Sequence, residues 1–300
     1  MNRTTAPVIT ALPQARARGA LGSIRSMRTL HHILVYGLLV GGSIVFLLPL
    51  LWMLFTSLKV SSAVFAYPPS FLPTSLEWHN YIDGWTALPF TTFLKNSVII
   101  TGANVVGNVL SCSLVAFGFS RLRARGRGLL FLLVLGTMMI PNEVTMVPRF
   151  ILFKQLGWIN TLAPLIVPAW FGYPFFIFLL RQFFMGIPRE LDEAAYIDGA
   201  SFFRVFWNII LPLSKPALGA VAIFSFIGNW NNLLDPLIYL RSQDLYTIAL
   251  GLNLFLGQYV TVVNQLMAVS ILALVPILVI FFFAQKMFVQ GVSLTGMGGR

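Results

Sequence analysis

The residues whose types and spacing point to a particular task lie in one polar stretch of an otherwise apolar chain. Pro188 precedes the acids Glu190, Asp192 and Glu193, and Gly199 follows them. Proline suits the first position of a helix, acids stabilise the positive end of the helix dipole, and glycine can end a helix with a positive φ. The pattern predicts a short acidic helix that stops at Gly199.

A second short helix is predicted directly after the first. Ser201 or Asp198 can cap its first turn, and Pro212 ends it. Its apolar residues recur at helical spacing, namely Phe202, Phe203, Phe206, Ile209 and Ile210. The pair is either an amphipathic hairpin on a membrane surface or a docking surface for another protein. Only docking explains why so apolar a chain keeps such a long polar loop.

The groups that would make this chain an enzyme are missing from its sequence. It has no G-x-x-x-x-G-K-[ST] loop for ATP, no G-x-S-x-G elbow, and no cluster of His, Asp and Glu within an apolar stretch. The single Cys112 can form no disulfide within the chain, and no Cys/His spacing fits a metal site. The net charge of +11 comes from basic residues between apolar runs, which is typical of membrane-protein loops. We therefore expect no catalytic residue, no metal or cofactor, and no nucleic-acid partner.

The composition indicates a protein whose solvent is mostly lipid. Hydrophobic residues make up 57% of the chain and charged residues only 10%, against about 25% charged in a soluble domain. About 20 apolar residues cross a bilayer as a helix, because lipid offers the backbone no other hydrogen-bond partner. The sequence predicts an all-α integral membrane protein whose domain spans residues 31–288. Its six expected spans are about 33–57, 96–120, 129–153, 161–180, 217–240 and 266–285.

Positive charge predicts the orientation of these spans. Of the 20 Lys and Arg residues, 15 fall on one side of the predicted topology, and that side should be cytoplasmic. It holds a basic tail at residues 1–30, expected to be disordered, the polar loop 181–216, and a C-terminal tail at 289–300. Pro141 is expected to kink the third span, and a short interfacial helix is expected between Arg241 and Gln265.

The polar stretch resembles the EAA loop of ABC importer permeases, E-A-A-x-x-x-G followed by I-x-L-P. The coupling residues that it supplies are Glu193, Ala194, Ala195, Asp198, Gly199, Ile209, Leu211 and Pro212. Other segments resemble the MalG-like branch of carbohydrate-importer permeases: Met139-Ile140-Pro141, Phe178-Leu179-Leu180-Arg181-Gln182-Phe183-Phe184, Tyr246-Thr247 and Phe288-Val289-Gln290-Gly291. One segment departs from that pattern, since Trp230-Asn231-Asn232 stands where relatives usually have Trp-Asn-Asp.

The resemblance implies the fold of a type I ABC importer permease in a bacterial inner (plasma) membrane. Such a subunit moves a sugar or sugar-like solute into the cell. It pairs with a second permease and with two copies of a cytosolic ATPase, and an extracytoplasmic binding protein delivers the solute. ATP and Mg would be bound by the ATPase, whose basic residues would meet Glu193.

Polar residues inside the spans are candidates for the solute path, because such residues usually face a cavity or another helix. The candidates in the fifth span are Asn229, Trp230, Asn231, Asn232 and Asp235, and those in the second are Asn104 and Asn108. Amides pair with hydroxyl groups, and sugar rings stack on aromatic rings. The alternative role for these residues is hydrogen bonding between helices.

Two other functional classes compete with the permease interpretation. An ion-coupled secondary transporter tends to keep ionisable residues at the midplane and paired broken helices. Glu143 and Asp235 are the only acids in or near the spans, and no paired breaks are evident. An intramembrane enzyme would need the catalytic groups that the sequence lacks.

Overall fold

The computed structural model describes the backbone of residues 15–258 and 262–296, and the side chains of 31–257, 262–283 and 285. These residues form helices, turns and loops, and no strand occurs among them. The chain divides into two units, residues 1–55 and residues 56–300. Four helices of the described part are long and apolar enough to cross a membrane, or up to six if each of two bent pairs counts as one span.

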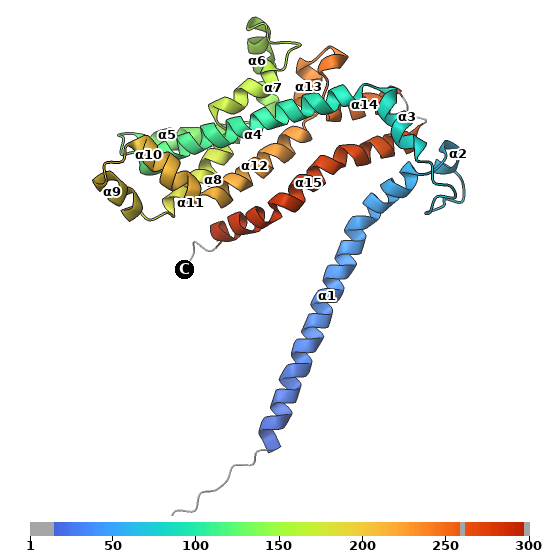
Figure 1. Cartoon of the computed structure of the whole chain (residues 1–300), viewed down its shortest axis with the longest axis horizontal. Coiled ribbons are helices and arrows are strands. Elements are labelled where there is room, and N and C mark those ends of the chain that lie inside the picture. Colours follow the sequence, from blue (N-terminus) through green and yellow to red (C-terminus); the bar gives the residue numbers. More distant parts are fainter. Residues whose placement is uncertain (1–14, 259–261, 297–300) are drawn as a thin grey trace, which may run out of the picture. The chain divides into compact units, whose positions relative to one another are not determined.

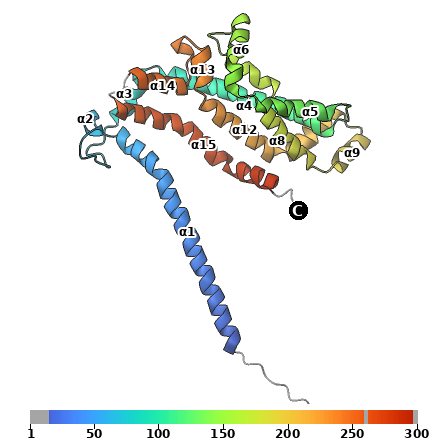
Figure 2. The same ribbon diagram turned by 180° about the vertical axis from the view of Figure 1, so that it is seen from behind.

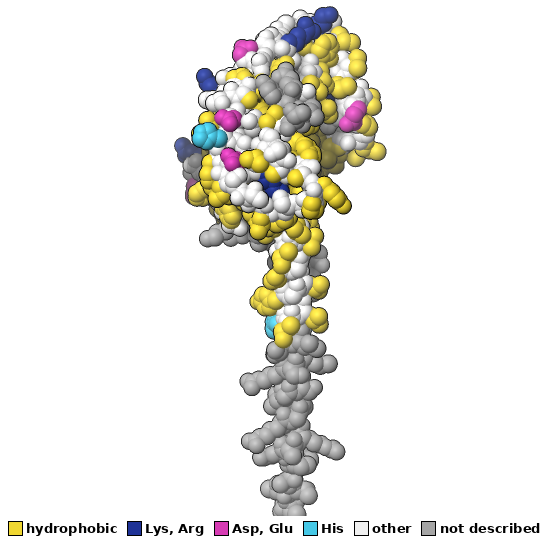
Figure 3. All heavy atoms as spheres, turned by 90° about the vertical axis from the view of Figure 1, so that its right-hand side faces the viewer, with side chains coloured by type: hydrophobic (Ala, Val, Ile, Leu, Met, Phe, Trp, Pro, Cys, Tyr) yellow, Lys and Arg dark blue, Asp and Glu magenta, His cyan; other side chains and the backbone are white. Residues whose placement is uncertain are grey.

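The first unit consists mainly of helix α1 (Ala15–Ser57), whose apolar part runs from His31 to Ser57. Its side chains are exposed along most of that part, and Figure 3 shows apolar groups covering it. The sequence predicted a disordered tail over residues 1–30, but the helix already begins at Ala15. The Ala and Arg residues of this stretch are good helix formers and extend the apolar helix backwards. Residues 1–14 lie outside the described part.

Helix α4 (Phe90–Arg121) is the central element of the second unit. It packs along α12 (Lys215–Trp230) and α8 (Pro174–Met185), and α12 packs in turn against α15 (Val263–Gly296). Figures 1 and 2 show these long helices side by side from opposite directions. The helices correspond to four of the predicted spans. Because α15 continues to Gly296, most of the predicted C-terminal tail is helical.

The third predicted span is broken at the proline that the sequence singled out. Helix α5 (Arg127–Gly136) and the 3₁₀ turn η1 (Thr137–Met139) lead to Pro141, and α6 (Asn142–Gln155) leaves at an angle of 99°. The expected kink is confirmed, and it divides the predicted span 129–153 into two helices. Proline cannot donate a backbone hydrogen bond, and it disfavours helical geometry in the residue before it.

The next predicted span consists of several short helical elements. Helix α7 (Ala163–Ile166) passes into the 3₁₀ helix η2 (Val167–Phe171), and α8 follows. Gly172 joins them with a φ of 95°, a conformation that side chains rarely adopt.

The fifth predicted span, 217–240, is not one helix. Helix α12 ends at Trp230, and α13 (Leu234–Tyr239) starts after a short break. The Asn232 side chain accepts from the backbone N of Asp235 at 3.2 Å and donates to the Asp235 carboxylate at 2.8 Å. Asparagine thereby replaces helical backbone bonds with local ones. Beyond the 3₁₀ turn η4 (Gln243–Leu245), α14 (Ile248–Gln258) confirms a helix between Arg241 and Gln265.

The loop between α1 and α4 contains α2 (Ser61–Val64) and α3 (His79–Ala87), and buried amides fasten it to α15. Asn80 Nδ2 donates to the carbonyl oxygens of Ser57 (2.8 Å) and Lys59 (2.9 Å). Asn264 Nδ2 donates to the Lys59 carbonyl (3.1 Å) and to Asn80 Oδ1 (2.9 Å). Ser61 Oγ donates to Asn264 Oδ1 at 3.2 Å. We call these contacts the Asn80–Asn264 network.

Candidate functional site

The acidic helix is α9 (Glu190–Ile197), with Glu190, Asp192 and Glu193 in its first turn as predicted. The helix begins after Arg189, so Pro188 precedes the first helical position instead of filling it. Gly199 has a φ of 78°. Its N donates to the Tyr196 carbonyl at 3.0 Å, and Ala200 N donates to the Ala195 carbonyl at 2.9 Å. This pair of bonds is a Schellman motif, in which a left-handed residue closes the helix.

The second helix follows at once, as α10 (Phe202–Val205), the π-helical turn η3 (Phe206–Ile210) and α11 (Leu211–Leu213). Of the two predicted caps, the structure uses Ser201, whose Oγ accepts from Arg204 N at 3.4 Å. The chain then turns by 79° into α12. Pro212 lies in the last turn before this bend. We call residues 190–213 the coupling segment.

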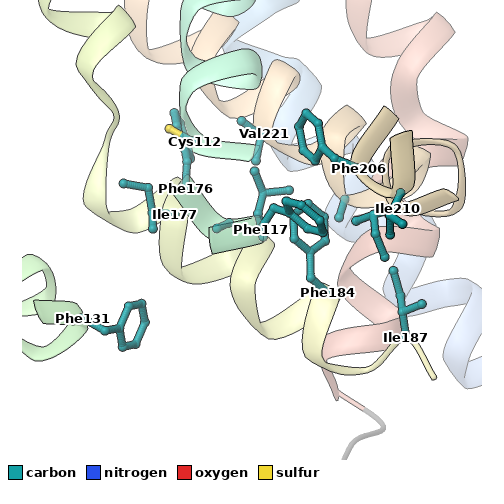
Figure 4. Packing of buried hydrophobic residues seen from close by; sticks show 14 residues of the cluster. Cys112, Phe117, Phe131, Phe176, Ile177, Phe184, Ile187, Phe206, Ile210 and Val221 are labelled. Atoms are coloured by element: carbon teal, nitrogen blue, oxygen red, sulfur yellow. The ribbon is translucent and has the colours of Figure 1, made fainter. Parts of the chain in front are cut away.

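One face of the coupling segment is packed against α4 and α8. Val205, Phe206 and Ile210 are buried there, and Ile209 and Leu211 are partly buried beside them. The Phe117 ring of α4 lies 4.4 Å from the Phe202 ring and 5.1 Å from the Phe206 ring, centroid to centroid. Figure 4 shows Phe117, Phe184, Phe206 and Ile210 in this cluster.

The other face of the coupling segment is exposed, and it is both acidic and apolar. Glu193, Ala194 and Asp198 are exposed, whereas Ala195 is partly buried in the cluster. Ile197 is 87% exposed, Phe203 61% and Trp207 53%. Large apolar side chains mixed with charges on a free face are typical of a surface that binds another protein.

A buried ion pair joins α9 to α4. Arg121 Nε lies 3.0 Å from Asp192 Oδ2, and the Arg121 guanidinium also donates to the Ile187 carbonyl at 2.9 Å. Burial raises the pKa of the Asp192 carboxyl above its ordinary value, and the nearby Arg121 and Arg189 oppose that rise. Sequence patterns of single helices could not reveal this pair, because its partners lie on different helices.

A cavity of about 550 Å³, lined by both polar and apolar side chains, lies among α4, α6, η2, α12 and α13. Five of the seven predicted path residues line it, namely Asn104, Asn108, Asn229, Asn232 and Asp235. Trp230 does not, because its ring is 4% exposed, stacks on Phe226 and donates to the Ala273 carbonyl at 3.2 Å. Asn231 is exposed elsewhere and donates to the Ile227 carbonyl of its own helix at 2.9 Å.

The asparagines beside the cavity hold neighbouring helices together through their amide nitrogens. Asn104 Nδ2 donates to the Leu165 carbonyl at 2.8 Å and to Asn229 Oδ1. Asn108 Nδ2 donates to Ser225 Oγ at 3.0 Å. The Oδ1 atoms of Asn104 and Asn108 are buried, yet they accept no hydrogen bond from any group in the described part of the chain.

Residues 107–294 match the family described as binding-protein-dependent transport system inner membrane components. The chain belongs to this family. The matched region contains the whole coupling segment and most of the cavity wall. Membership of this family confirms the resemblance that the sequence motifs indicated.

Relatives from several organisms match most of the chain. The arabinooligosaccharides transport system permease protein AraQ of Halalkalibacterium halodurans is 39% identical over 76% of this chain and 82% of its own length. The trehalose/maltose transport system permease protein MalG of Thermococcus litoralis is 32% identical over 86% and 94%. The diacetylchitobiose uptake system permease protein NgcG of Streptomyces coelicolor is 31% identical over 92% and 91%.

A solved structure shares the fold of this family member. It is a chain of a bacterial ABC transporter involved in the import of the acidic polysaccharide alginate. The two chains superpose with a TM-score of 0.77 at 24% identity, over 88% of this chain and 98% of that one.

Some cavity residues were not among the predicted path residues. Arg149 of α6 and Tyr239 of α13 line the cavity, and Arg149 Nε and the Tyr239 hydroxyl have no hydrogen-bond partner among the described residues. The sequence does carry a signal for α6, since Asn142 and Arg149 stand two helical turns apart and therefore share a face. The bend at Pro141 directs α6 along the cavity.

Proposed function

We propose that this chain is a transmembrane permease subunit of an ATP-driven importer, and that it transmits the work of a separate ATPase through the coupling segment. The observation that carries the proposal is the two-faced construction of α9–α11. One face is packed into the spans, and the other presents Glu193, Ile197 and Trp207 to a partner. A surface of this kind can transmit a displacement of the bound partner to α4.

The finer assignments follow from the same proposal. Six spans leave both termini and the coupling segment on the cytoplasmic side of a bacterial plasma membrane. A second permease completes the channel, two copies of the ATPase bind ATP and Mg, and an extracytoplasmic binding protein presents the solute. The relatives named for oligosaccharide and disaccharide transport support a sugar or sugar-like solute.

The cavity is our candidate for part of the solute path. Its wall includes the partly exposed side chains of Asn229, Asn232, Asp235 and Arg149 as hydrogen-bonding groups. Hydroxyl groups both donate and accept hydrogen bonds, so a hydroxyl-rich solute can bond to these groups. Trp230 and Asn231 are not part of this proposed path, because neither lines the cavity.

A co-purification experiment tests the proposed coupling. The tagged chain is extracted from its native membrane in mild detergent, and its partners are identified by mass spectrometry. We expect a P-loop ATPase and a second multi-span permease with the wild type, and loss of the ATPase with Glu193→Lys. Glu190→Lys is the matched control, because it reverses an equally exposed charge on α9 outside the EAA motif and should keep the ATPase.

The competing class makes the opposite prediction. The acids Glu143 and Asp235 line the cavity beside Arg149, as charges would in an ion-coupled transporter. Such a transporter would be recovered without an ATPase, and a protonophore would abolish its uptake while ATP remained high. That combination would overturn the proposal.

A further inference from the structure

The buried ion pair between Arg121 and Asp192 is the basis for an inference about how α9 and α4 move. Arg121 is the last residue of α4, and Asp192 lies in the first turn of α9. Their side chains are only 5% and 9% exposed, although both residues lie at the ends of helices.

Stability alone is a poor reason for such a pair. Charges lose hydration when they are buried, and a well-packed apolar pair is often as stable or more so. Removing one partner is worse, because it leaves the other charge buried alone. Asp192 Oδ1 accepts no hydrogen bond from the described residues, so Arg121 is the group that contacts this carboxylate. Arg189 and Glu193 are its other charged neighbours, with opposite effects on it.

The geometry of the pair restricts how α9 can move relative to α4. Arg121 contacts the coupling segment through Asp192 and the connection before it through the Ile187 carbonyl. The hydrogen bond to the Ile187 carbonyl is directional, whereas the contact with Asp192 is ionic, because Arg121 Nε has no hydrogen-bond partner among the described residues. Together the two contacts restrict how far α9 can move from the end of α4. One turn earlier on α4, Phe117 contacts Phe202 and Phe206. The last turns of α4 therefore hold both helices of the coupling segment.

The same helix leads directly to the cavity. Asn108 and Asn104 lie on α4, and at a rise of about 1.5 Å per residue Asn108 is about 20 Å from Arg121 along the helix axis. A continuous helix is stiff over this length, so a displacement of its end at Arg121 reaches the cavity wall.

We propose that Arg121 and Asp192 are positioning residues that make α9 and α4 move as one body, so that a displacement of the coupling segment changes the cavity. This inference rests on the proposed function, because it assumes an ATPase that moves α9. The proposal assigns the transmission of this displacement to one ion pair. Loss of the pair should uncouple ATP hydrolysis from transport without releasing the ATPase.

The test uses the complete transporter in proteoliposomes, with its binding protein and solute, and measures solute uptake per ATP hydrolysed. We expect Asp192→Asn to keep the ATPase bound and to lower this ratio about tenfold, a usual size for a coupling between sites. The exchanged pair, Arg121→Asp with Asp192→Arg, restores part of the ratio, because it restores the ion pair but not the hydrogen bond to the Ile187 carbonyl. Arg125→Gln removes an exposed charge outside the coupling segment, four residues after Arg121, and leaves the ratio unchanged.

A second variant separates positioning from stability, and it serves if the single substitution does not fold. Arg121→Met combined with Asp192→Leu removes both charges and leaves neither unpaired. It folds and binds the ATPase, but apolar side chains do not fix direction, so the ratio remains low. A wild-type ratio in this double variant, or in Asp192→Asn, would overturn the proposal.

The outcomes also separate this proposal from the one before it. A wild-type transporter without ATP-dependent uptake would contradict the proposed function itself. Normal ATP-dependent uptake in wild type and variants alike would contradict only the role of the ion pair.

Discussion

Asn80 and Asn264 use every amide atom to hold the chain together, whereas Asn104 and Asn108 each leave a buried oxygen that no described residue pairs. In the Asn80–Asn264 network, both Nδ2 groups donate twice and both Oδ1 atoms accept. Beside the cavity, the Nδ2 groups of Asn104 and Asn108 bind neighbouring helices, but their Oδ1 atoms accept no hydrogen bond from the residues that the structure describes.

The difference separates a fully paired amide from one that is paired at one end only. A buried polar atom without a partner costs free energy, so nearly all such atoms in native proteins are paired by protein or by water. The Oδ1 atoms of Asn104 and Asn108 are closed to solvent in this structure, so water or a solute would reach them only after the surrounding helices move. Hydrogen bonds between helices therefore account for only one end of each of these two side chains.

The largest effect should come from breaking the fully paired network. Asn264→Leu removes its bonds to Lys59 and to Asn80, and it leaves the buried Asn80 Oδ1 without a donor. Losses of this kind destabilise a protein by about 3 kcal/mol in total. We expect a clear fall in the melting temperature of the detergent-solubilised protein and a low yield of monodisperse protein. Asn231→Leu should change neither, because Asn231 is exposed and bonds only within its own helix. Wild-type melting of Asn264→Leu would show that the network is not structural.

Packing beside the same network gives the next effect in size. Gly84 of α3 faces α15 so closely that an added Cβ would lie 2.9 Å from the Val269 side chain and 3.0 Å from the Gln265 carbonyl oxygen. Gly84→Ala must push the two helices apart, which costs about 2 kcal/mol. Thermal unfolding in detergent should show a lower melting temperature, with uptake per folded molecule unchanged. An unaltered melting temperature would mean that α3 does not pack against α15 in this way.

The sequence predicted the coupling segment better than any other part of the site. Acids, Gly199 and Ser201 act locally, so helix ends and the turn between them can be inferred from neighbours in the chain. The structure adds what local patterns do not contain, namely that Arg121 contacts Asp192 and that Phe117 contacts Phe202. Both contacts join residues far apart in the sequence.

Where the observed helices differ from the predicted spans, the differences have a common physical origin. Hydropathy measures whether a stretch prefers lipid, and it contains little information on whether the helix is continuous. Residues 217–240 are mostly apolar, yet local bonds of Asn232 and Asp235 break the helix. Pro141 predicted a break in the third span, but the angle of 99° depends on the packing of α6. Trp230 was ambiguous because an indole ring suits a solute path and a helix interface equally well.

Asn108→Ala should affect transport more than stability. It removes one neutral hydrogen bond, to Ser225, and one amide at the cavity. Ser225→Ala removes the same bond and keeps the amide, so it is the matched control. A lost hydrogen bond to solute is equivalent to about 1 kcal/mol, and we expect the KM for uptake to rise about fivefold in Asn108→Ala only. Equal KM values in the two variants would assign Asn108 to helix packing alone.

Gly228→Ala should have the smallest effect, and it tests directly whether the cavity wall on α12 has free space beside it. Gly228 lines the cavity on α12, and an added Cβ would meet no atom within 4 Å, in contrast to Gly84. Alanine is favoured over glycine inside a helix by up to about 1 kcal/mol, so the melting temperature should stay the same or rise slightly. The methyl group nevertheless occupies space that a bulky solute would use. Uptake of a longer oligosaccharide should fall about twofold, since one methyl group perturbs binding by less than about 1 kcal/mol, while uptake of a shorter one is unchanged. If Gly228→Ala lowered the melting temperature as Gly84→Ala does, the cavity wall would be closely packed, and the two asparagine oxygens would need a partner within the protein.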